Sequence, residues 1–195
     1  TGGGTVEKID DVRYLSNFSS GKMGSSLALA LFFKGADVSF ISSKFPQRLP
    51  ISMRQIDAQD TREMKESITA SIHEAKKTLT THTDAELTQK EPFLFMAAAV
   101  SDYVPSTVEH GKLKKSDIGE TWSLDLKQNE DLLSNINTDG VYTIGFKAEM
   151  DAQRGLDNAK AMLVKKGLDA VCFNLLKDSS RFGTDDHALE FITKQ

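Results

Sequence analysis

Small and hydrogen-bonding residues gather in one short stretch, RYLSNFSSGKMG at residues 13–24, directly before an apolar helical pattern. Serine hydroxyls, tight glycines and the free backbone N–H groups of a helix start form a site for anions such as phosphate. A second stretch, GGGT at residues 2–5, would let backbone N–H groups approach a phosphate because glycine has no side chain to block it. A third, AAAVSDY at residues 97–103, places small residues and then a carboxylate after an apolar run. Together the three stretches predict an anion-binding site.

Each of these features also has a purely structural interpretation. Ser19 or Ser20 could only cap the helix, and the glycines could only permit close packing. The KLKK run at residues 112–115 is typical of a solvated surface, and Cys172 in an apolar run is typical of a core thiol. The four histidines lack metal-ligand spacing. The combination of three strand-end loops with one basic loop favours a binding site.

Hydrophobic periodicity predicts the elements that would position these loops. Residues 36–42 and 93–100 are typical of strands buried on both faces, and residues 60–80 between them have the apolar spacing of an amphipathic helix. The strand–helix–strand order recurs at residues 142–149, 156–167 and 168–174. We therefore expect an α/β fold with a Rossmann-like open, mostly parallel sheet and helices on both faces. In such sheets ligands bind beyond the carboxyl ends of the strands.

The remaining segments are expected to be peripheral. Residues 121–127 and 188–194 alternate in polarity and could add antiparallel strands at an edge of the sheet. Residues 80–91 and 181–188 are polar and are predicted to be loops. Gly35 is predicted to end the first helix.

Length and composition bound the type of protein. With 195 residues, 39% hydrophobic and 27% charged, the chain is expected to form a single domain over residues 1–195. Its net charge of −4 is spread over mixed-sign segments, which disfavours a nucleic-acid partner. Its apolar runs are shorter than the roughly 18 residues of a membrane helix, so no membrane partner is expected. One cysteine allows no internal disulfide and fits a cytoplasmic location.

The chain starts with TGGGT, without Met or an apolar leader. We therefore expect no signal peptide and interpret the chain as a piece of a longer protein.

Seven motifs in one order carry a family resemblance. They are GGGTVEKIDDVRYLSNFSSGKMG (2–24), AAAVSDY (97–103), KLKK (112–115), NEDLL (129–133), IGFKAE (144–149), KKGLDAVCFN (165–174) and FGTDDHAL (182–189). Over nearly its whole length the chain resembles phosphopantothenoylcysteine synthetase, the phosphopantothenate–cysteine ligase of coenzyme A biosynthesis. In many bacteria this ligase is the C-terminal half of a bifunctional protein with an N-terminal flavin-dependent decarboxylase. FMN is therefore expected only if such a half is attached.

The resemblance implies a two-step, CTP-dependent ligation. The carboxylate of 4'-phosphopantothenate attacks the α-phosphate of CTP, which gives an acyl-cytidylate and pyrophosphate, and the amine of L-cysteine then displaces CMP. It also implies Mg²⁺, which would neutralise phosphate oxygens and for which Asp102 is a candidate ligand. A homodimer is expected, whose pockets are completed across the interface near Ala98 and Ala99.

The same resemblance implies roles for individual residues. Asn17 would donate an amide hydrogen bond to the acyl-cytidylate carbonyl, Arg13 would bind or orient the acidic substrate, and Lys112 would close over the nucleotide. Lys112 would do so as part of a flap with flexible ends at Gly111 and Gly119. The other implied nucleotide contacts are Gly3, Gly4, Ser19, Gly21, Gly24, Met96, Ala98, Asp102, Glu130, Asp131, Leu132, Leu133, Phe146, Met162 and Lys166.

Three positions depart from the usual pattern of the family. Glu130 stands where a proline is usual, which places an anion near the expected nucleotide. Met162 stands where a helix lysine is usual, with Lys160 as a candidate substitute from the same helix. His187 stands where relatives often have asparagine. We expect these changes to affect nucleotide affinity more than the type of reaction.

Two alternatives from other classes stay open. A nicotinamide-dependent reductase also uses a glycine-rich turn on a doubly wound sheet, although SSGKMG is not G-x-G-x-x-G and no acidic residue ends the strand near residue 42. Ser42, Ser43 and Lys44 could instead suit a 2'-phosphate. The second alternative is a non-catalytic regulatory relative with a relict site, against which the presence of Asn17 and Lys112 argues.

Overall fold

The computed structural model describes residues 1–81, 91–176 and 188–194. One side of its sheet consists of β5 (Phe93–Met96), β8 (Tyr142–Glu149) and β9 (Ala170–Leu175), which pair in parallel in that order. The edge strand β10 (Leu189–Thr193) pairs with β9 in the antiparallel sense. The mostly parallel sheet and the antiparallel strand within 188–194 are confirmed.

The other side of the sheet consists of β3 (Ser39–Ser42) and β4 (Arg54–Asp57), again in parallel. Residues 1–5 connect the two sides, because Gly2 forms a parallel bridge with Ser42 and Gly4 forms one with Ala99. The spatial order is therefore β4, β3, residues 1–5, β5, β8, β9, β10. The chain runs outward to β4 and then crosses back to β5, which makes residues 1–5 the topological switch point of a Rossmann-like sheet.

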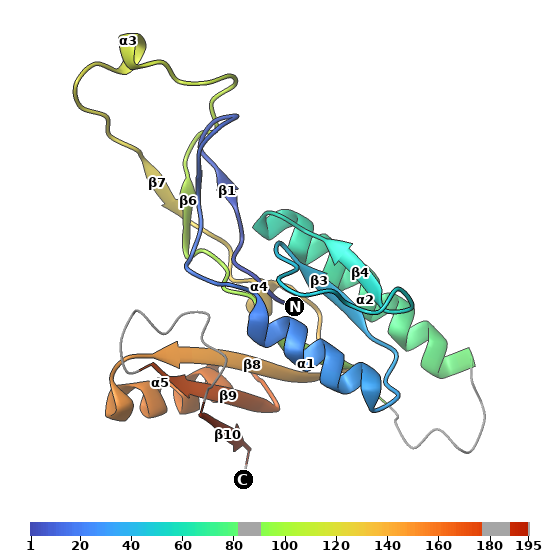
Figure 1. The fold of residues 1–195 in the computed structure, drawn as a ribbon. Coiled ribbons are helices and arrows are strands. Elements are labelled where there is room, and N and C mark those ends of the chain that lie inside the picture. Colours follow the sequence, from blue (N-terminus) through green and yellow to red (C-terminus); the bar gives the residue numbers. More distant parts are fainter. Residues whose placement is uncertain (82–90, 177–187, 195) are drawn as a thin grey trace.

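Helices cover both faces of this sheet, as predicted (Figure 1). Phe40 of β3 packs with Ala28 of α1 (Lys22–Phe33), whereas the next residue, Ile41, packs with Met64 and Ile68 of α2 (Thr61–Thr81). Successive side chains of a strand point to opposite faces, so α1 and α2 lie on opposite faces of the sheet.

Two further helices lie on the α2 face. Leu132 of α4 (Leu132–Asn135) joins the cluster of α2 and β5, and Leu163 of α5 (Ala152–Lys165) packs with Val171 and Phe173 of β9. None of the helices in the described part of the chain has both the length and the hydropathy needed to cross a membrane.

The ends of the first helices largely match their predicted positions. The predicted helix at 60–80 is α2, and Gly35 follows α1 with φ +88° while its N–H donates to Phe32 O at 2.9 Å. Strand β4 was missed because RQID holds a single apolar residue, Ile56, and so carries no alternation. Thr80 and Thr81 belong to α2 rather than to a loop, and residues 82–90 and 181–187 of the predicted loops lie outside the described residues.

An arm formed by residues 6–16 and 103–128 rises from the sheet (Figure 1). It holds two antiparallel pairs, β1 (Glu7–Lys8) with β2 (Tyr14–Leu15) and β6 (Tyr103–Pro105) with β7 (Leu126–Gln128), and the one-turn helix α3 (Lys115–Ile118) at its far end. The prediction that 121–127 adds an edge strand to the main sheet was wrong, since β7 pairs within the arm. Alternation predicts a strand but does not identify its partner.

Candidate functional site

A cavity of about 740 Å³ opens beside the switch point. Ligand pockets commonly measure about 300–1,000 Å³, so a nucleotide-sized molecule would fit. The cavity is lined by the start of α1, the loop after β5, the NEDLL segment, β8 and α5. Among its lining residues are these predicted site residues: Asn17, Ser19, Gly21, Gly24, Met96, Ala98, Asp102, Glu130, Asp131, Leu132, Leu133, Phe146, Met162 and Lys166.

The start of α1 forms one wall. Gly21 precedes the helix with φ +75°, a conformation that favours glycine, and Ser20 Oγ accepts a hydrogen bond from Lys22 N at 3.3 Å. Ser20 thus bonds one backbone N–H at the helix start, whereas the N-cap position itself is Gly21, which has no side-chain cap. The first N–H groups of a helix have no intrahelical partner, so this wall presents backbone donors and the positive end of the helix dipole to the cavity.

Gly24 has a packing reason that goes with this wall. A Cβ placed on Gly24 would lie 2.6 Å from the backbone oxygen of Thr1 and 2.9 Å from Gly2 Cα. The absence of a side chain thus lets α1 lie directly against residues 1–5. Gly24 therefore permits close packing, as the structural interpretation expected, and this packing also places the start of α1 at the cavity.

Gly3 and Gly4 do not line the cavity, unlike the other glycines of the predicted phosphate site. Both are buried, Gly4 O accepts from Ser43 Oγ at 2.6 Å, and Gly3 O accepts from Ala99 N at 2.8 Å. Gly3 and Gly4 thus lie inside the sheet, at the switch point, and do not face this cavity of their own chain. Local geometry accounts for glycine at both positions, because Gly3 has a φ of +74° and a Cβ on Gly4 would lie 2.8 Å from the backbone oxygen of Asn17.

Asn17 stands at the cavity rim, where its amide Nδ2 donates to Val100 O at 3.1 Å. This bond ties the segment before α1 to the loop after β5. The side chain is exposed, so its amide is accessible to a ligand in the cavity.

The NEDLL segment carries two acids that are both paired with lysines. Asp131 Oδ1 accepts from Ser134 N and caps α4, and Asp131 Oδ2 lies 2.9 Å from Lys166 Nζ. Burial opposes ionisation of Asp131, but the Lys166 hydrogen bond and charge and the Ser134 N–H outweigh it and hold its pKa below the usual value. Glu130, the unusual anion, forms an ion pair with Lys65 of α2. A lysine of this chain thus offsets the charge that replaces proline.

Asn129 joins the two loops of the site, a role that the sequence interpretation missed. Its Nδ2 donates to Thr61 Oγ1 and to Ser101 O, both at 2.8 Å, and its backbone N–H donates to Asp102 O at 2.8 Å. Asn129 was within the quoted NEDLL motif, but its partners come from segments distant in sequence. Only the fold brings them together.

The far wall is apolar. Met162 and Phe146 line it, and a Cβ on Gly145 would lie 2.9 Å from Met162 Cε. Cys172 is 9% exposed and packs with Ile144, which confirms it as a core residue, although it also lines the cavity. Burial raises its pKa. Lys160, the candidate substitute for the missing helix lysine, is exposed and is not among the lining residues.

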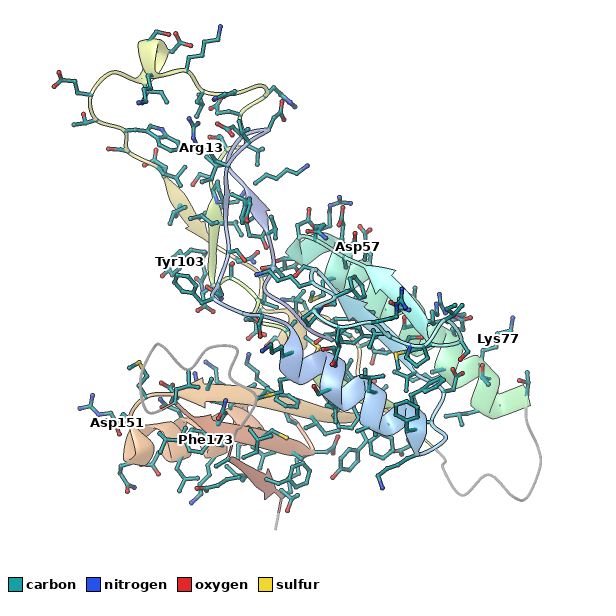
Figure 2. The ribbon with its side chains drawn as sticks, in the orientation of Figure 1. Arg13, Asp57, Lys77, Tyr103, Asp151 and Phe173 are labelled. Carbon is teal, nitrogen blue, oxygen red and sulfur yellow. The ribbon has the colours of Figure 1, made fainter. Side chains whose placement is uncertain are left out.

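Arg13 and Lys112 lie in the arm and do not line the cavity of their own chain. Figure 2 shows Arg13 far along the arm, whereas Tyr103, a lining residue, lies at its base. Arg13 pairs with the buried Asp10 and donates through Nη2 to Leu113 O at 3.0 Å. The three residues with implied catalytic roles are therefore not brought together within one chain.

The described residues contain no cluster of three or more His, Cys, Asp or Glu side chains placed to hold a metal. At the cavity, Glu130 and Asp131 are paired with lysines, and Asp102 is exposed at the rim. Magnesium in nucleotide sites commonly uses one or two carboxylates with substrate phosphates, so Asp102 fits such a shared site but not a closed protein cage. His187 lies outside the described residues.

The sheet order and the cavity at its switch point define a Rossmann-like α/β domain with an open pocket where such sheets bind their ligands. Residues 1–195 match the family described as the DNA/pantothenate metabolism flavoprotein C-terminal domain, and the chain belongs to this family.

Relatives and solved structures agree with this membership. The coenzyme A biosynthesis bifunctional protein CoaBC of Vibrio cholerae is 34% identical over 200 residues, which cover 100% of this chain and 45% of the relative. The chain thus spans just under half the length of that relative. A crystal structure of the C-terminal domain of CoaBC is similar with a TM-score of 0.67 and 25% identity, over 89% of this chain and 74% of that one. A Cab2 variant in complex with phosphopantothenate-cysteine has the same fold, with a TM-score of 0.58 and 16% identity over 100% of this chain and 78% of that one.

Proposed function

We propose that the chain is a phosphopantothenate–cysteine ligase that uses CTP and forms phosphopantothenoylcysteine through an acyl-cytidylate, in coenzyme A biosynthesis. One observation carries the proposal. Residues assigned to the nucleotide by their motifs come from separate segments of the sequence, and most of them line one cavity. Family membership and the CoaBC relatives support the same reaction.

The cavity walls suit the two anionic reactants. The start of α1 offers backbone donors to the triphosphate, and Lys166, fixed by Asp131, adds a cation on the opposite side. Fixed donors of this kind stabilise charge that develops at phosphorus without reorganising in the reaction. Asp102 is the residue that would help to hold Mg²⁺, which would supply further charge neutralisation for the phosphates.

Asn17 is assigned to the second half of the reaction. In this role its amide turns from Val100 O to the carbonyl of the acyl-cytidylate, whose oxygen gains negative charge as the cysteine amine attacks. We assign recognition of the cytosine ring of CTP to the backbone of Met96–Ala98 and to the Asp131 loop. These groups would accept a pyrimidine and leave too little room for a purine.

The arm supports a homodimer as the working unit. Arg13 and Lys112 do not line the cavity of their own chain, so the arm of a second copy is proposed to bring these cations to it. A closed two-fold dimer would give both pockets the same completion. The proposed location is the cytoplasm. FMN belongs to the proposal only through a decarboxylase half, should the chain be attached to one.

The structure removes the support that Ser42, Ser43 and Lys44 gave to the reductase alternative. Ser42 Oγ donates to Lys44 O at 2.6 Å and accepts from Lys44 N at 3.1 Å, and Ser43 Oγ donates to Gly4 O. Lys44 Nζ donates to Ser19 O at 2.8 Å. The groups suggested for a 2'-phosphate therefore serve the loop itself.

A coupled pyrophosphate assay tests the proposal. The protein is incubated with Mg²⁺, 4'-phosphopantothenate, L-cysteine and either CTP or ATP at equal concentration. We expect pyrophosphate release that requires phosphopantothenate and is clearly faster with CTP. Equal rates with ATP would contradict the assignment of CTP, and no phosphopantothenate-dependent release would overturn the proposed ligase.

A further inference from the structure

A buried carboxylate lies inside the arm, away from the cavity. Asp10 is only 1% exposed and occupies the turn between β1 and β2. Its Oδ1 accepts from the backbone N–H groups of Val12 at 2.8 Å and Arg13 at 2.7 Å. Its Oδ2 accepts from Leu113 N at 3.2 Å and forms an ion pair with Arg13. A buried charge is tolerated only when it is paired and hydrogen-bonded in this way.

The Arg13 guanidinium extends this contact to both ends of one loop segment. Its Nη2 donates to Leu113 O at 3.0 Å, and its Cζ lies 5.6 Å from the ring centroid of Trp122. A planar guanidinium can donate in a fork and stack on an aromatic ring at the same time, which an ammonium group cannot do as well. The residues from 113 to 122, which include α3, are therefore closed into a loop by one side chain.

Lys112 is anchored on both sides by the same turn. On one side, Gly111 N donates to Asp11 Oδ2 at 2.8 Å, and on the other, Leu113 both donates to Asp10 and accepts from Arg13. Two fixed backbone positions flank the residue, so the start of its side chain has a defined place although the side chain is exposed.

We propose that Asp10 is a positioning residue which acts through Arg13 to hold Lys112 and both ends of the 113–122 loop in one arrangement. This inference rests on the proposed function, in which Lys112 serves the nucleotide. It assigns Arg13 a structural task in the free chain besides its implied contact with substrate. It also explains why an acid is buried in the arm, away from the cavity of its own chain.

The test compares Asp10→Asn with Asp125→Asn, which removes an exposed acid of the same arm. Asparagine keeps the size of Asp10 but would direct an amide N–H toward Arg13 or Leu113 N. Trp122 is the single tryptophan, so tryptophan fluorescence reports only the surroundings of Trp122 and its contact with Arg13. For Asp10→Asn we expect a red-shifted emission and stronger acrylamide quenching, and for Asp125→Asn no change.

Kinetics give a second readout. With Asp10→Asn we expect kcat for pyrophosphate release to fall about tenfold or more, which corresponds to roughly 1.4 kcal/mol of transition-state stabilisation. The KM for CTP should change less than kcat, because the α1 wall that binds the phosphates is intact. Wild-type kinetics and fluorescence in Asp10→Asn would overturn the inference.

A third measurement needs no variant and covers the case in which Asp10→Asn fails to fold. In wild-type protein, amide hydrogen exchange should be slow at Leu113, whose N–H is bonded to Asp10, and fast at Ser116 in the same loop. Equal fast exchange at both amides would overturn the inference. If wild-type protein shows no ligase activity, the proposed function fails, while the fluorescence and exchange results still decide whether Asp10 holds the arm.

Discussion

At the scale of single residues, polar side chains of the site already have protein partners before any ligand binds. Asp131 caps α4 and pairs with Lys166, Asn129 joins two loops, and Asn17 donates to Val100 O. Such bonds hold the donors in place, which lowers the entropy lost when a ligand binds. They also mean that a substitution at these positions affects geometry as well as chemistry, so each variant needs a check of its fold.

Asn17→Asp should separate the two steps of the reaction. The carboxylate keeps the shape but loses the donor and repels the developing oxyanion, so the step with cysteine should slow by about a hundred- to a thousandfold. In rapid-mixing experiments, CTP and phosphopantothenate should still release pyrophosphate, while phosphopantothenoylcysteine accumulates slowly. Asn137→Asp, at an exposed asparagine away from the cavity, serves as the control. Product formation at the wild-type rate would remove Asn17 from the mechanism.

The thiol of Cys172 should react slowly with iodoacetamide. Burial disfavours the thiolate and raises the pKa above the ordinary 9.0, so at any pH below 9 the folded protein has less of the reactive form than a free cysteine. Mass spectrometry should show little adduct at pH 8 and faster reaction above pH 9. Since this is the single cysteine, every adduct reports it. The urea-unfolded chain is the control, and equal rates at pH 8 in folded and unfolded protein would contradict the expectation.

At the scale of elements, the site depends on how closely α1 approaches the switch point. The helix start lies against residues 1–5 because Gly24 has no side chain, and the same approach directs its backbone donors to the cavity. The site also depends on the NEDLL segment, whose Asn129 links Thr61 at the start of α2 to the loop after β5. Helix ends and strand ends thus meet at one edge of the sheet.

Gly24→Ala should destabilise the fold and weaken nucleotide binding together. Its Cβ would meet backbone atoms, which cannot move aside as a flexible side chain can, so we expect a loss of about 1–3 kcal/mol in the free energy of unfolding. Urea denaturation measures this loss, and calorimetry measures CTP affinity. Ser26→Ala, at an exposed position of the same helix, should stay within about 0.5 kcal/mol. A Gly24→Ala protein of unchanged stability and affinity would show that the contact is not tight.

At the scale of the whole molecule, the cavity and the arm are separate parts of one chain. The sheet, α1 and α5 supply the cavity and the assigned cation Lys166, whereas Arg13 (Figure 2) and Lys112, the other two cations assigned to the reaction, lie in the arm. A dimer in which each arm serves the other pocket reconciles these two facts. Such an exchange makes a specific prediction about mixtures of inactive variants.

Mixing Asn17→Asp with Lys112→Gln should restore activity. In a mixed dimer, the chain with intact Asn17 would receive Lys112 from its partner, so one of the two pockets would be complete. Random exchange of subunits makes half of the dimers mixed, and about a quarter of wild-type activity is expected. The assay follows product formation after co-refolding of equal amounts. Each variant alone is the control, and a mixture no more active than its components would place Lys112 in the pocket of its own chain.

Sequence patterns determined the mostly parallel α/β class and several strands and helices of the main sheet, because these patterns depend on local properties, although they did not identify β4. Residues 142–149 are β8 and residues 61–81 are α2, where period 2 or continuous apolarity and the 3.6-residue period are strong. Most of the expected nucleotide residues line the cavity, since short motifs at strand ends keep their place when the strands are parallel.

Tertiary structure alone decided the contacts between distant segments. Asp10 with Leu113, Asn129 with Thr61, Lys65 with Glu130, and β6 with β7 carry no local signal, because each partner is an ordinary polar side chain, a backbone N–H group or a short strand. The same holds for the separation of Arg13 and Lys112 from Asn17. Arg13 and Asn17 are only four residues apart in the sequence. An extended backbone rises about 3.3 Å per residue, so Arg13 lies in the arm whereas Asn17 lines the cavity.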